Sequence, residues 1–223
     1  MKKILLTFLL ATTVLYMGAQ ERKTQSRNVG SFNEIHAGKG INVVLVEGDK
    51  EKVVVEIENG EVTDVISELK GRKLNIKFKT KIYNNVAVKV FVTYKSIKAI
   101  TTGSGAFVES DGIIRAENLD LRAGTGSTII LEVDTKAVSS SLSSSKIELA
   151  GKTDFQDVTS NTGAKYIADQ LVSKDAFVKT ATGGTAWVTA TDKLEAKTST
   201  GGKVIYTGNP KKLIQKGNVH RDN

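Results

Sequence analysis

Thr101–Ser110 reads TTGSGAFVES, with two threonines, the triplet Gly103-Ser104-Gly105 and a short apolar run. A glycine-rich loop that binds phosphate normally opens a helix, because backbone N–H groups and the helix dipole then converge on the anion. Here the residues after the glycines favour a strand, and they end at Asp111-Gly112, which is itself a turn signal. The stretch therefore predicts a corner between strands.

The same corner recurs along the C-terminal half of the chain. Segments of the form small-x-x-apolar follow one another at steps of 21, 18, 19, 21 and 18 residues: GAFV at 105, GSTI at 126, SSKI at 144, GAKY at 163, GTAW at 184 and GKVI at 202. Short strands also occur in antiparallel sandwiches. A return of equivalent residues every twenty or so positions, with no helix between them, favours a β-solenoid of stacked coils.

Stacked coils predict an internal column of side chains. The apolar residue of each segment would point inward over its equivalent in the previous coil: Val108, Ile129, Ile147, Tyr166, Trp187 and Ile205. If Tyr166 and Trp187 point outward instead, they form a face on which a carbohydrate ring could stack.

The N-terminal half alternates apolar and polar residues with period two. RKLNIKFK (72–79) and VAVKVFV (86–92) each have one apolar face, whereas INVVLVEG (41–48) is apolar on both faces and predicts a strand covered on both sides. Within INVVLVEG, Asn42 is expected to be a buried amide that bonds the backbone of a neighbouring coil. Gly60–Lys70 is the one segment here whose spacing also fits a short helix.

The ordered set of motifs resembles a known family. Phe32 and Ile35 precede Gly40-Ile41-Asn42, the strands above follow, and then comes Gly103-Ser104-Gly105. Over residues 29–215 the chain is similar to the head GIN domain of autotransporter adhesins, a domain of unknown function common in secreted proteins of Bacteroidetes-type bacteria. The resemblance implies an all-β, right-handed parallel β-helix or β-solenoid, divisible into two sections packed at an angle. Gly40, Ile41, Asn42, Gly103, Ser104 and Gly105 are then structural family-motif residues.

Both ends of the chain are basic. Lys2 and Lys3 precede an apolar stretch from Ile4 to Met17, which predicts a signal peptide over residues 1–19 and export to the periplasm, the outer membrane or the extracellular space. Its removal leaves 30 basic and 24 acidic residues, a net charge of +6. Residues 216–223 form a polar basic tail, expected to be solvated and partly frayed.

Few residues are suited to catalysis or metal binding. There is no cysteine, and His36 and His220 are too few for a Ser-His-Asp triad or a His-rich metal site. We therefore expect no catalytic, metal or cofactor residues. The acidic pairs Asp154/Asp157, Asp169/Asp175 and Asp192/Glu195 could act as acid and base on a polysaccharide, but Asp is also common at corners. Three or more charges in one groove would favour the enzyme.

The leading interpretation is a secreted, noncatalytic β-solenoid that acts by surface contact, with envelope polysaccharide or a surface protein as partner. The alternatives are a polysaccharide lyase or hydrolase on the same scaffold, and an envelope protein that self-assembles through open coil ends. A homo-oligomer fits either non-enzymatic interpretation. The sequence has no concentrated basic stripe and no aromatic platform for nucleic acid, and after cleavage it has no integral membrane segment. Tyr166 and Trp187 are the tentative ligand-stacking residues.

Overall fold

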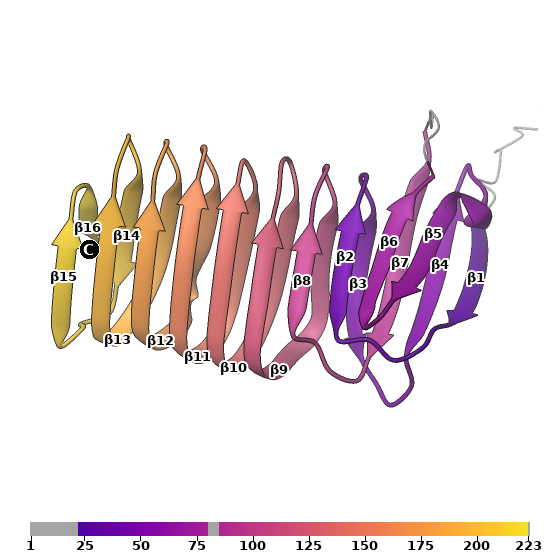
Figure 1. The fold of residues 1–223 in the computed structure, drawn as a ribbon, viewed down its shortest axis with the longest axis horizontal. Coiled ribbons are helices and arrows are strands. Elements are labelled where there is room, and N and C mark those ends of the chain that lie inside the picture. The colour runs from indigo at the N-terminus through magenta and orange to yellow at the C-terminus, as the bar shows by residue number, and fades with distance from the viewer. Residues whose placement is uncertain (1–21, 80–84, 223) are drawn as a thin grey trace, which may run out of the picture.

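The structure is a computed structural model that describes residues 22–79 and 85–222. Coils lie side by side along the long axis of a flattened tube, from β1 at one end to β15 and β16 at the other (Figure 1). The predicted β-solenoid is thereby confirmed. The predicted signal peptide, residues 1–19, lies outside the described residues. Within the described ranges, no helix has the length and apolar character needed to span a bilayer.

Two groups of strands make up the tube. The N-terminal section comprises β1 (Arg22–Asn28), β2 (Glu34–Gly38), β3 (Asn42–Glu47), β4 (Lys52–Glu58), β5 (Val65–Lys70), β6 (Lys73–Phe78), β7 (Ala87–Tyr94) and β8 (Ala99–Thr102). The coils comprise β9 (Phe107–Ala123), β10 (Thr128–Ser143), β11 (Lys146–Asn161), β12 (Lys165–Thr180), β13 (Thr185–Thr198), β14 (Lys203–Thr207), β15 (Lys212–Lys216) and β16 (Val219–Arg221).

The long strands β9–β13 each bend once and contribute to two opposite faces. On one face the strand order is β1-β4-β7-β3, then the first halves of β9–β13, then β14 and β16, and we call this the β3 face. On the opposite face the strand order is β5-β6-β2-β8, then the second halves of β9–β13, then β15, and we call this the β8 face. Coil-to-coil pairing is parallel, whereas β1–β4, β4–β7 and β5–β6 are antiparallel.

Tight turns join one coil to the next along one edge of the tube (Figure 1). In the turn at Gly103-Ser104-Gly105, Ser104 and Gly105 have φ of 50° and 74°, and Ala106 N–H donates to Gly103 O at 3.2 Å. Positive φ at both central residues is the geometry of a type I′ turn, which glycine adopts without steric cost. The turns also bond one another, since Gly40 N–H donates to Ser104 O at 2.9 Å and Gly105 N–H donates to Thr125 O at 3.2 Å.

The core is a column of apolar side chains, only part of which agrees with the sequence-based expectation. Val108, Ile129, Ile147 and Tyr166 lie in register and are fully buried, as predicted. The prediction is wrong for Trp187 and Ile205. Tyr166 pairs with Ala186, and Ala186 pairs with Val204, so the last two members of the column are these smaller residues. Trp187 and Ile205 lie one position further along the chain and face outward.

Two local expectations are also wrong, and the short helix that Gly60–Lys70 could form is present only as a single turn. Asn42 is exposed on the outside of β3 while Ile41 and Val43 are fully buried, so its amide has no place in the core. Gly60–Lys70 contains a single 3-10 turn at Val62–Asp64 and then strand β5, because Val65 and its neighbours pair with β6.

The expectation of a partly frayed basic tail is the second that is wrong. Val219–Arg221 of the tail form β16, which pairs with β14 and completes the last coil begun by β15.

Candidate functional site: the outer faces of the coils

An apolar stripe runs across the outside of the β3 face near its C-terminal end. Ile167, Trp187 and Ile205 occupy one register position on β12, β13 and β14, and all three are partly exposed. Their Cα atoms are therefore separated by the strand spacing of about 4.8 Å. Because alternate residues of a strand point to opposite sides, Trp187 cannot share the core with Ala186 and Val188.

Polar groups border this stripe on both sides. In the row before it, Thr185 lies in register between Lys165 and Lys203. In the row after it, the hydroxyls of Thr189 and Thr207 are 2.7 Å apart, and Thr189 Oγ1 donates to the backbone oxygen of Asp169. The surface thus combines one large flat ring with hydrogen-bond donors in the row before it and hydroxyl oxygens that can accept hydrogen bonds in the row after it.

Tyr166, the other proposed stacking residue, cannot touch a ligand because it is fully buried. Its hydroxyl donates to Gln156 Oε1 at 3.1 Å, and Gln156 Nε2 donates to Ser173 Oγ at 2.8 Å. Burial raises the pKa of the Tyr166 hydroxyl, so it remains a protonated donor. Tyr166, Gln156 and Ser173 thus form a hydrogen-bonded polar cluster inside the tube. The spacing of apolar residues in the sequence does not predict such a cluster.

Two of the six acidic candidates for catalysis, Asp154 and Asp192, are paired with lysines of the next coil. They belong to a series of four carboxylates along the edge where the long strands bend: Glu117–Lys136 at 2.6 Å, Asp134–Lys152 at 3.3 Å, Asp154–Lys174 at 2.7 Å and Asp192–Lys211 at 2.8 Å. We call these the edge ion pairs. Glu195 pairs with Lys193 and Lys197, and these two lysines lower the pKa of its carboxyl.

A hollow of about 580 Å³ follows this edge, and its lining includes Arg115 together with members of three edge ion pairs. It meets the criterion of three charges in one groove. However, the partner carboxylates raise the pKa values of Lys136 and Lys174, which makes these lysines poorer proton acceptors at neutral pH. The arrangement is that of a structural charge ladder. Within the described residues, no group of three His, Asp or Glu side chains is placed to hold a metal ion.

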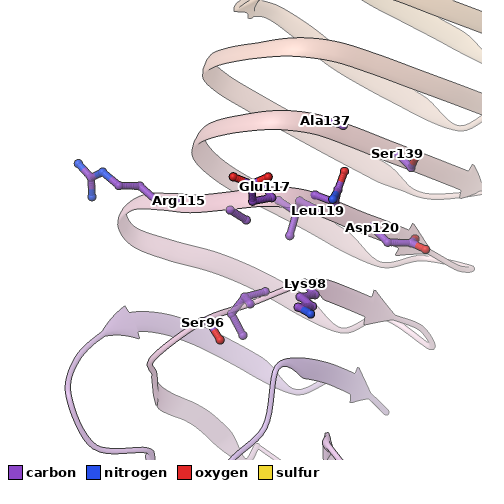
Figure 2. Close-up of a pocket in the computed structure, with 11 residues that line it drawn as sticks. Ser96, Lys98, Arg115, Glu117, Leu119, Asp120, Ala137 and Ser139 are labelled. Carbon is purple, nitrogen blue, oxygen red and sulfur yellow. The ribbon is translucent and has the colours of Figure 1, made fainter.

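A second hollow lies where the β7–β8 connection meets β9 and β10. Figure 2 shows Lys98 and Glu117 beside this space of about 510 Å³, with the side chain of Arg115 directed away from it. Arg115 pairs with Glu47, Glu117 with Lys136, and Asp120 with Arg122. Each charge that could act on a ligand here already has a partner, except Lys98, for which no ion pair is found among the described residues.

His36 lies in the middle of a sheet and not at a strand edge, since β2 pairs with both β6 and β8. Burial, together with nearby Lys73 and Lys77, lowers its pKa from 6.5. The fold therefore favours neutral histidine, and the unfolded chain binds more protons as the pH falls through 6.5.

We expect His36→Gln to be more stable relative to the natural chain at pH 5 than at pH 8. Urea unfolding at both pH values checks this, and a pH-independent difference would contradict it.

The family profile described as "Putative auto-transporter adhesin, head GIN domain" matches residues 31–210. The chain belongs to the head GIN domain family. This confirms the resemblance seen in the sequence. No curated protein matches the chain.

Solved structures of similar fold come from Bacteroides and Parabacteroides species. A putative adhesin of Bacteroides fragilis superposes with a TM-score of 0.83 at 18% identity, covering 91% of this chain and 97% of its own. A putative adhesin of Parabacteroides distasonis gives 0.73 at 20% identity, covering 92% and 98%. A structure from the same species, titled as a putative lipid binding protein, gives 0.71 at 19%, covering 91% and 97%. At these identities the likeness shows the fold of the head GIN domain and nothing about a ligand.

Proposed function

We propose that this head GIN domain is an exported, noncatalytic adhesion module that binds carbohydrate on its β3 face, with Trp187 as the central contact. The observation that carries the proposal is the outward position of Trp187 between Ile167 and Ile205. A partly exposed tryptophan offers a flat apolar surface at small cost in side-chain entropy, and such residues often dominate binding energies. Membership of an adhesin family supports a role in surface contact.

Two features support a noncatalytic role over a polysaccharide lyase or hydrolase. The carboxylates of Asp154, Asp192 and Glu195, which belong to the candidate acid–base pairs, are engaged by lysines. An acid–base pair needs one carboxyl whose pKa is raised toward neutrality, and the lysine neighbours of Glu195 act in the opposite direction.

Replacing Trp187 with alanine tests the binding surface. We expect at least about a tenfold loss of affinity for the glycans that the natural chain selects on an array of envelope polysaccharides, because truncating a central aromatic contact commonly has effects of this size. Calorimetry on the selected glycans gives the affinities. Phe155→Ala is the matched control, because Phe155 is a partly exposed aromatic residue on the opposite, β8 face.

Two results would contradict the proposal. Equal affinities of Trp187→Ala and the natural chain would remove Trp187 from the binding surface. Depolymerisation of any glycan by the natural chain would show that the module is an enzyme.

A further inference from the structure

The outer side of the β8 face ends in three lysines placed one over another. Lys179 of β12 pairs in register with Lys197 of β13, and Lys197 pairs with Lys216 of β15. All three are exposed. We call them the lysine row. Adjacent strands lie about 4.8 Å apart, so the three side chains start from points along a straight line parallel to the axis of the solenoid.

A shallow hollow of about 330 Å³ lies along the lysine row. Its lining consists of the three lysines and of uncharged residues near the coil corners, most of them polar: Asn161, Thr180, Ala181, Thr198 and Ser199. No carboxylate contributes to this lining. In this respect it differs from the hollow along the edge ion pairs, where both signs of charge are present.

Within the described part of the chain, two of the three ammonium groups have no carboxylate partner. Lys197 contacts Glu195 at 2.8 Å, whereas the described residues provide no ion pair for Lys179 or Lys216. By contrast, the lysines of the edge ion pairs each have a carboxylate on the preceding coil. The chain thus neutralises one edge of the tube and leaves the lysine row positive.

This arrangement does not stabilise the fold. Like charges directly opposite on neighbouring strands repel and lower the stability of a sheet. Lysines on an edge strand can prevent sheet-to-sheet aggregation, which would account for Lys216 on β15. It does not account for Lys179 and Lys197, because β12 and β13 have a paired strand on each side.

We propose that the lysine row is a binding site for an acidic polysaccharide, whose carboxylate or sulfate groups lie along the axis of the solenoid. A straight line of ammonium groups in a narrow hollow fits a linear polymer that carries one acid group after another. Hydroxyls such as that of Ser199 supply hydrogen-bond donors to the sugar. The site lies on the opposite face from Trp187 and does not depend on binding there.

The test compares two triple variants of the full chain with equal loss of charge. One carries Lys179→Gln, Lys197→Gln and Lys216→Gln, and the control carries Lys136→Gln, Lys152→Gln and Lys174→Gln from the edge ion pairs. Calorimetry with polygalacturonate and with dextran sulfate separates carboxylate from sulfate recognition, and neutral dextran serves as the blank. We expect the lysine-row variant to bind the acidic polymers about tenfold or more weakly, because it loses three exposed charge contacts. The affinity of the control variant should change less than about twofold.

Further readouts separate a defined site from general attraction. Replacing the three lysines of the row with arginine should preserve binding, and Trp187→Ala should leave it unchanged. The affinity of the natural chain should fall as salt is raised, because exposed charges are screened. Lys179→Gln alone should raise the midpoint of thermal unfolding by about 1–3 °C in low salt, since it relieves repulsion.

Three results would overturn the site. Equal losses in the two triple variants would show attraction by net charge alone. Binding to vesicles of phosphatidylglycerol but to neither polymer would point to a membrane surface instead. Absence of binding to both polymers at low salt would also refute it, and none of these outcomes bears on the Trp187 surface.

Discussion

A chain in which Gly184 is replaced by alanine is expected to lose about 3 kcal/mol or more of its free energy of unfolding. Gly184 follows the turn between β12 and β13, and a β-carbon there would lie 2.1 Å from the backbone oxygen of Ser160 and 2.6 Å from its carbonyl carbon. Ser160 belongs to β11, which is paired with a strand on each side. The neighbouring backbone therefore cannot move aside without loss of ladder hydrogen bonds.

The adjacent glycine provides the control for this prediction. Gly183 has φ of +74°, but a β-carbon there would meet no atom closer than 3.9 Å. Asparagine tolerates this backbone conformation better than other residues, so Gly183→Asn should cost less than about 1 kcal/mol. Urea unfolding of both variants measures the two changes. Similar losses of stability in the two variants would show that the close approach of Gly184 to the Ser160 backbone is not the cause of the destabilisation.

Tyr166→Ala is the second variant with a large expected effect. The ring fills the tube between Ile147 and Ala186, its neighbours in register, and is fully buried. Removal of a large buried aromatic side chain leaves a cavity and typically costs about 3–5 kcal/mol of the free energy of unfolding. The small Ala186 above it offers no side chain that could fill the space.

Tyr166→Phe separates packing from hydrogen bonding at the same position. The ring remains, but Gln156 Oε1 loses the hydroxyl that donates to it. An unsatisfied buried acceptor costs about 1–3 kcal/mol, so Phe should be less damaging than Ala. Denaturant unfolding of both variants gives the comparison. If Phe were as harmful as Ala, the polar cluster and not the packing of the ring would dominate stability at this level of the tube.

The repeat sufficed to predict the solenoid, because stacked coils return equivalent residues at a nearly constant interval. The small-x-x-apolar pattern did not predict the correct register of the last coils. Aligning the repeats on Gly184 and Gly202 places Trp187 inside, whereas the structure makes Gly183 and Gly201 the turn glycines. A shift of one residue exchanges the two sides of a strand. The hydroxyl residue that precedes each turn glycine, Thr182 and Thr200 like Ser104 in the first turn, was the signal that fixes the register.

The candidate binding residues were harder to predict than the fold. The aromatic ring of Trp187 is evident from the sequence, but its outward position depends on that one-residue shift. The lysine row could not be read from the sequence, because Lys179, Lys197 and Lys216 are far apart in it and become neighbours only through the pairing of β12, β13 and β15. The same holds for Gln156, whose burial depends on Tyr166 and Ser173 reaching it from another coil.

The hydrogen bonds between successive turns connect each coil only to the coils on either side. A protein built in this way can gain or lose length in evolution by whole repeats, since duplication or deletion of one unit recreates the same junction. Insertion of a single residue within the straight part of a strand has a different result, because it would exchange the inner and outer sides of the residues that follow it. Differences in coil length are therefore expected near the bends, where neighbouring strands already shift register.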